Sequence, residues 1–111
     1  MPQTWAWFHN PRTVLSLVRK LGEGTRVSLL VRDPEAQESV MVMGPLSRNM
    51  ACYPFLDVRY QIRRFGITKS LAEHYTRVIA RGGVVVCIES ADSDALGVLH
   101  DLDAQDVLAP A

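Results

Sequence analysis

The sequence predicts an α/β fold in which two strand-helix-strand units contribute to one sheet. Three observations support it: a strand, a helix and a strand follow one another near the N-terminus, the same order recurs near the C-terminus, and residues 84–88 are all apolar. The order follows from side-chain periodicity, which is 2 in a strand and 3.6 in a helix. Residues 33–82 are expected to be an insertion between the two units, within a single domain that spans residues 1–111.

The first unit covers residues 4–32. Residues 4–8 are rich in aromatic side chains and predict a strand. Asn10 and Pro11 predict a helix start, because the Asn side chain can accept a first-turn N–H and Pro lacks a donor that would be unpaired there. Gly22 predicts the end of this helix. The following strand alternates between two rows and is expected to be half-buried, with Val27, Leu29 and Val31 in one row and Arg26, Ser28, Leu30 and Arg32 in the other.

The inserted block is expected to hold one strand and two helices. Residues 39–43 predict a strand, whereas residues 46–54 show no period and are expected to be a loop. Apolar side chains at helical spacing predict a helix from Phe55 that closes at Gly66. A further helix is expected to start within residues 68–70, where Ser70 and Glu73 have the spacing of a capping box.

The second unit begins with the run Val84–Ile88, which has no polar alternation and is therefore expected to be covered on both faces. A last helix and a short strand at 106–108 follow. Two such units favour a ferredoxin-like two-layer sandwich, one sheet with helices on one face. The inserted elements could extend that sheet or cover its open side. A doubly wound parallel sheet is the alternative, but it would require more crossover helices.

Composition excludes several classes of partner. Twelve basic and twelve acidic residues cancel, so no nucleic-acid partner is expected from charge, because phosphate binding usually requires a basic excess. No stretch approaches the roughly 20 apolar residues that cross a bilayer, so no membrane partner is expected. Cys52 and Cys87 form no disulfide framework, and the first residues show no secretory signal. These features predict a cytoplasmic location with reduced thiols.

The stretch from Gly66 to Tyr75, followed by Arg81-Gly82-Gly83 and a valine-rich strand, resembles bacterial general stress proteins of the heat-induced YflT/17M-like group. The matching positions are Gly66, Ile67, Ala72, Tyr75, Gly82 and Gly83. The resemblance is best over residues 66–107, where Asp103 stands in place of a family glycine and Thr68 in place of a proline. Residues 33–65 lack the glycine-rich middle segment of the family. The resemblance implies a stress-associated protein, and the family carries no assigned chemistry.

The histidines do not predict a catalytic or metal site. His9, His74 and His100 have no Cys or His at ligand spacing. The junctions at His9 and at Glu89 follow strands that are expected to run antiparallel, so they should lie at opposite ends of the sheet. Catalysis requires converging groups. We therefore expect a protein that is not an enzyme and has no cofactor.

Aromatic residues and methionines are candidates for an interaction surface. Trp5 and Trp7 lie on the same face of their strand, which would form either a core wall or an exposed patch. The mid-chain apolar residues Met41, Met43, Met50, Tyr53 and Phe55 would either fill the core or line an adaptable contact. These residues favour self-association through the sheet or through residues 41–55.

A basic helix at residues 57–65 is a further candidate. Arg59 and Arg63 share one face of it, and such a face is usually solvated but could contact RNA. The leading hypothesis is therefore a non-enzymatic, stress-associated assembly module that forms a homo-oligomer. A small-ligand sensor domain is the second hypothesis, by analogy of fold alone, and RNA binding through the helix at 57–65 is the third.

Overall fold

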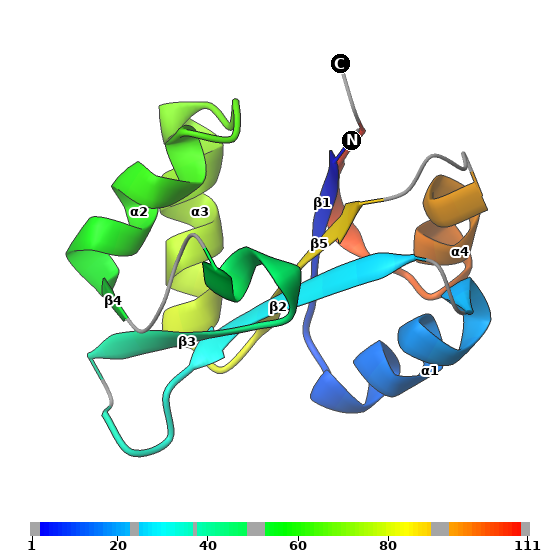
Figure 1. The fold of residues 1–111 in the computed structure, drawn as a ribbon, viewed down its shortest axis with the longest axis horizontal. Coiled ribbons are helices and arrows are strands. Elements are labelled where there is room, and N and C mark those ends of the chain that lie inside the picture. The colour runs from blue at the N-terminus through cyan, green and yellow to red at the C-terminus, as the bar shows by residue number, and fades with distance from the viewer. Residues whose placement is uncertain (1–2, 23–24, 37, 49–52, 90–93, 110–111) are drawn as a thin grey trace.

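The computed structural model describes residues 3–22, 25–36, 38–48, 53–89 and 94–109, with the backbone alone for residues 53–56 and 94. These residues form a mixed α+β protein with one antiparallel sheet and four α-helices (Figure 1). The elements are β1 (Gln3–Phe8), α1 (Pro11–Leu21), β2 (Arg26–Arg32), β3 (Ser39–Met43), the 3₁₀ helix η1 (Pro45–Arg48), β4 (Tyr53–Pro54), α2 (Phe55–Arg63), α3 (Lys69–Ala80), β5 (Val84–Glu89), α4 (Asp94–Asp101) and β6 (Gln105–Leu108).

The sheet has the strand order β4-β3-β2-β5-β1-β6, and every neighbouring pair is antiparallel. The units β1-α1-β2 and β5-α4-β6 are interleaved, so that β5 lies between β1 and β2. The inserted block adds β3 and the two-residue β4 beyond β2. The predicted strands and helices of both units are confirmed within one or two residues at their ends.

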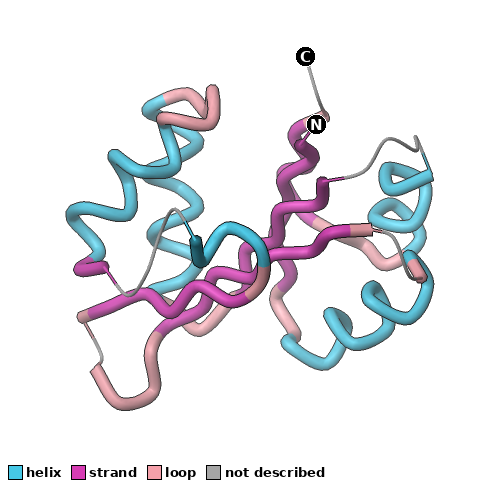
Figure 2. Tube along the Cα trace, viewed as in Figure 1, coloured by secondary structure: helices cyan, strands magenta, loops and turns pink. Residues whose placement is uncertain are grey.

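Helices cover both faces of the sheet. One core cluster joins α2 and α3 to the sheet through side chains such as Trp5, Val58, Ile62, Tyr75 and Val85. The second cluster joins α1 and α4 to the opposite face (Figure 2). The expectation of two layers with helices on one face is therefore wrong for the whole chain. The inserted block does both things that the sequence left open: β3 extends the sheet, and α2 with α3 adds a third layer.

The strand β5 occupies the centre of the sheet and is covered on both sides. All five residues of Val84–Ile88 are buried, as predicted from their uniformly apolar sequence. Val85 and Cys87 belong to the α2/α3 core, and the other three belong to the α1/α4 core. Gly83 enters this strand so close to α3 that an added Cβ would lie 2.5 Å from Val78 Cγ1, which explains the glycine at this position.

In strand β2 the row of side chains that contains Ser28 is buried more deeply than the fully apolar row. Ser28 and Leu30 are fully buried, whereas Val27, Leu29 and Val31 are only half-buried. Ser28 is tolerated in the core because its Oγ accepts the backbone N–H of Leu46 at 3.0 Å. The polar residue of the sequence pattern thus faces the better-covered side of the sheet.

The helix starts follow capping chemistry with one correction. Asn10 caps α1 by accepting the N–H of Arg12 at 3.0 Å, and Pro11 is the first helical residue, as predicted. In α3 the cap is Thr68, whose hydroxyl accepts the N–H of Leu71, so the Ser70–Glu73 capping box is wrong. Residues 46–54 are not only loop, because η1 and β4 lie within or across this range. No helix in the described part of the chain is long and apolar enough to cross a bilayer.

Candidate functional site

The α1/α4 face of the sheet is covered unevenly. Both helices contact β1, and their core includes side chains of β1 and β5. The β2–β3 pair lies beyond them (Figure 1). On this face the register places Leu29 beside Met43 and Val31 beside Met41. We call these four side chains the apolar wing.

The apolar wing is accessible to solvent in the isolated chain. Leu29, Val31 and Met41 are half-buried, and Met43 is 39% exposed. Their neighbours on the same strands, Leu30, Val40 and Val42, point to the α2/α3 core and are buried. The β2–β3 pair therefore has one face fully packed and the other only partly covered: Leu29 and Val31 pack against the α1/α4 core but stay partly accessible, and Met43 is exposed. A contiguous open apolar surface of this kind typically marks an interaction site.

The helix α1 adds a ridge beside the wing. Val14 and Leu17 face the sheet, whereas Leu15 and Val18, which share a flank of the helix, are exposed, Leu15 by 64%. Helical connections between parallel strands of one sheet are right-handed in almost all proteins, and the α-helix is right-handed too. For β1, α1 and β2 these two rules place the Leu15–Val18 flank on the β2 side of the helix.

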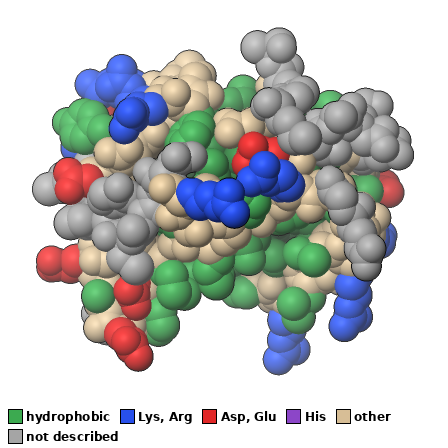
Figure 3. Space-filling view, viewed as in Figure 1, with side chains coloured by type: hydrophobic (Ala, Val, Ile, Leu, Met, Phe, Trp, Pro, Cys, Tyr) green, Lys and Arg blue, Asp and Glu red, His purple; other side chains and the backbone are tan. Residues whose placement is uncertain are grey.

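Charges of opposite sign border this apolar region. The helix α1 carries Arg12, Arg19 and Lys20, all exposed, and no acidic residue. The turn between β2 and β3 carries Asp33, Glu35 and Glu38. Figure 3 shows hydrophobic side chains along the lower side of the molecule, with acidic groups at the lower left and basic groups at the lower right. The surface thus has an apolar centre with a basic and an acidic margin.

Hydrogen bonds order the described residues at the β2 end of the acidic turn. The backbone N–H of Asp33 donates to the carbonyl of Ser39 at 3.0 Å, which closes the turn. The carboxylate of Asp33 accepts the N–H of Glu35 at 2.9 Å, as in an Asx turn. These two bonds hold the Asp33 end of the acidic margin beside β2 and β3.

The structure separates the interaction residues that the sequence predicted. Trp5 is buried in the α2/α3 core, where its ring stacks with that of Tyr75, so for Trp5 the core-wall alternative holds. Trp7 lies on the same face and is partly exposed. Met43 lies on the opposite face, in the apolar wing. Met50 and the side chains of Tyr53 and Phe55 lie outside the described residues.

The basic residues of α2 lie on the α2/α3 side of the molecule. The guanidinium of Arg59 lies 5.3 Å from the ring centre of Tyr60, so it makes a cation–π contact within α2. Arg63 lines a concavity beside the start of α3. Neither residue lies near the apolar wing, because α2 packs against the other face of the sheet.

A polar cluster joins β6 to α3, and sequence reasoning did not identify it. The carboxylate oxygen Oδ2 of Asp106 accepts the Trp7 indole N–H at 2.7 Å and lies 2.8 Å from Nε2 of His74. The backbone carbonyl of Asp106 accepts the hydroxyl of Tyr75 at 2.8 Å. The hydrogen bond from Trp7, followed by that from His74, holds the pKa of Asp106 below its usual value. Asp106 has a positive φ of 47° at an irregularity of the β1–β6 pairing, and these contacts hold it there.

The titratable groups form no metal centre in the described part of the chain. The antiparallel register of β1 and β5 places His9 and Glu89 at opposite ends of the sheet, as expected. No group of three His, Cys, Asp or Glu residues among those described could hold a metal ion. Burial raises the pKa of the Cys87 thiol well above its usual value, which disfavours the reactive thiolate.

Comparisons with known proteins identify no relative: no family model, no curated protein and no solved structure matches the chain.

Proposed function

We propose that the protein is a non-enzymatic assembly module that forms a two-fold dimer through the apolar wing. The observation that carries this proposal is the incompletely covered apolar face of β2 and β3, where Leu29, Val31, Met41 and Met43 lie side by side. Methionine side chains adapt their shape to a partner, which suits them to such a contact. Burying apolar surface stabilises association by about 25 cal/mol per Å².

The basic and acidic margins of the apolar region favour a second copy of this chain as the partner. In a dimer with its two-fold axis along the strands, the α1 ridge of one copy rests on the apolar wing of the other. The N-terminal end of each α1, with Arg12, then meets the acidic turn of the partner, with Glu35 and Glu38. Because the contact occurs twice, one surface supplies both halves of each charge pair. Complementary charges of this kind fix the register of an interface more than they add affinity.

Two finer features belong to the same proposal. The order β2-β5-β1-β6 of the four strands, with α1 and α4 on one face, supports a ferredoxin-like core that the inserted block enlarges. A stress-associated role rests on the resemblance of residues 66–107 to the general stress proteins, and a cytoplasmic location rests on the cysteine pattern and the first residues of the sequence. Assembly without chemistry is consistent with both features.

Sedimentation velocity over a range of concentrations tests the proposal. We expect the natural chain to form dimers at micromolar concentration and Met43→Asp to remain monomeric, because a carboxylate would be buried without a partner at the interface. Leu96→Asp is the matched control. Leu96 is 37% exposed, close to the 39% of Met43, but it lies on α4, on the far side of α1 from the wing.

Circular dichroism separates a loss of association from a loss of folding, since all three proteins should unfold cooperatively. A natural chain that stays monomeric at high micromolar concentration would contradict the proposal. Equal effects of Met43→Asp and Leu96→Asp would place any interface elsewhere.

A further inference from the structure

A concavity of about 400 Å³ lies between the end of α2 and the start of α3. It belongs to the helical layer on the face of the sheet opposite the apolar wing, so it is separate from the proposed dimer contact. Buried Ile67 contributes to its lining, and Tyr60 forms part of its wall. Its volume falls within the range of sites that bind small molecules, about 300–1,000 Å³.

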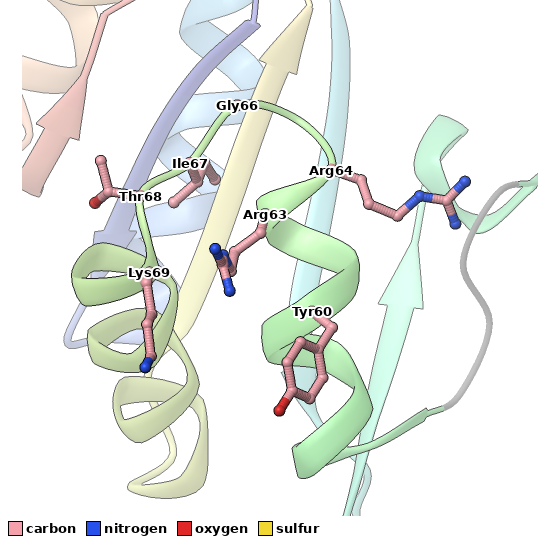
Figure 4. A pocket seen from close by; sticks show the side chains of 7 residues that line it. All are labelled: Tyr60, Arg63, Arg64, Gly66, Ile67, Thr68 and Lys69. Atoms are coloured by element: carbon pink, nitrogen blue, oxygen red, sulfur yellow. The ribbon is translucent and has the colours of Figure 1, made fainter.

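Positive charge converges on this concavity from two helices. Arg63 at the end of α2 and Lys69 at the start of α3 both line it; in Figure 4 the Arg63 side chain lies between the two helices and the Lys69 side chain runs along α3. Arg64 lines it as well, but its guanidinium turns away and hydrogen-bonds Gln61 at 3.2 Å. No acidic side chain is among the lining residues. Among the described residues, the one ion pair joins His74 to Asp106, and it involves none of these cations.

Lys69 occupies a position that a helix favours for a negative group. It is the first residue of α3, where the backbone dipoles place partial positive charge, and the first turn contains no acidic residue. The hydroxyl of Thr68 uses the N–H of Leu71. The N–H groups of Lys69 and Ser70 have no acceptor among the described residues. Lys69 and Arg63 are both exposed, so solvent screens their repulsion, and an anion bound between them would gain attraction from both and from the helix start.

Tyr60 provides a flat surface next to these charges. Its ring is 57% exposed although it is a large apolar group, and it lies one helical turn before Arg63. We propose that the concavity binds the phosphate groups of a small ligand between Arg63 and Lys69, with any planar ring attached to the phosphate lying against Tyr60. A nucleoside phosphate and a free polyphosphate share this chemistry. The concavity, the uncompensated cations and the exposed ring together support it.

Isothermal titration at low salt with ADP, pyrophosphate and adenosine tests this proposal. We expect ADP or pyrophosphate to bind and adenosine not to bind. Tighter binding of ADP than of pyrophosphate would identify the nucleotide, and equal affinity would identify the free polyphosphate. Lys69→Glu should weaken binding at least tenfold, and without ligand it should raise the melting temperature, because it removes a cation from the helix start.

Arg77→Glu is the control, since it makes the same charge change at the other end of α3, outside the concavity. It should leave the affinity within about twofold, because exposed charges far from a site are screened by salt. Equal losses in the two variants would overturn the proposal, since bulk charge would then explain binding. Binding of adenosine as tight as that of ADP would also overturn it. So would binding of a single-stranded RNA oligonucleotide in the absence of binding to ADP and pyrophosphate.

Discussion

The centre of the sheet and its β2–β3 side are built from equally apolar strands, but only the centre is covered on both faces. In β5 every side chain of Val84–Ile88 is buried between two pairs of helices. In β2 one row is buried and the other, with Leu29 and Val31, is half-open. When a strand carries more apolar side chains than its own chain covers, the uncovered ones indicate a surface for a partner. The following predictions test that difference between the two regions.

The largest effect is expected at the covered centre. Val86→Asp would place a carboxylate among Ala6, Phe8 and Leu17 without a partner. The loss should be at least about 4 kcal/mol in the free energy of unfolding, enough to prevent folding of a small domain. Circular dichroism and thermal unfolding measure it. A soluble Val86→Asp protein that unfolds cooperatively would show that β5 is not central.

Adjacent leucines of β2 provide a matched comparison of the two faces. Leu30→Ala should lower the free energy of unfolding by about 3 kcal/mol, because Leu30 is fully buried in the α2/α3 core. Leu29→Ala should lower it by about 1 kcal/mol, since Leu29 is only partly buried in the monomer.

Urea unfolding of both variants in the Met43→Asp background measures the difference without a contribution from dimerisation. Equal losses at the two positions would mean that a structural element covers the apolar wing within one chain.

A smaller effect concerns the attachment of the edge strand β6. The pKa of Asp106 is lowered in the folded state, mainly by the Trp7 indole N–H, so its carboxylate stabilises the fold above its unfolded pKa of about 3.9. This stabilisation is lost as the pH falls through the folded pKa. Asp106→Asn should therefore cost about 1 kcal/mol or less at pH 7, because the pair is exposed and screened.

Thermal unfolding of both proteins between pH 7 and pH 2 measures this contribution. The difference between Asp106→Asn and the natural chain should shrink toward zero at the acidic end. A difference that stays constant with pH would assign the effect of Asn to backbone geometry at the positive φ.

Much of the fold was predictable from local signals. Asn10-Pro11, Gly22 and the β-branched run at 84–88 specify a helix start, a helix end and a buried strand through chemistry within a few residues. The third layer was not predictable in this way. Whether α2 and α3 cover the sheet depends on where long-range packing places them, and their sequences fix only which of their faces are apolar.

The candidate site was predictable only in part. Met43 was identified as an interaction residue, but nothing local distinguishes Leu29 from Leu30, since both are leucines in one strand. Leu30 is the more buried of the two because its row, which includes Ser28, faces the α2/α3 core, where the Ser28 hydroxyl accepts the backbone N–H of Leu46. Asp106 was missed because its partners Trp7 and His74 are 99 and 32 residues away in the chain.

Mixing two charge-reversed proteins tests the two-fold dimer most directly. Arg12→Glu places like charges at both contacts of a homodimer, and so does the pair Glu35→Lys with Glu38→Lys. An equimolar mixture restores opposite charges at both contacts. Native mass spectrometry of the mixture should show heterodimers in clear excess over the statistical half, and each variant alone should dimerise more weakly than the natural chain. A statistical mixture, or dimers unaffected by either reversal, would contradict association through the apolar wing in this geometry.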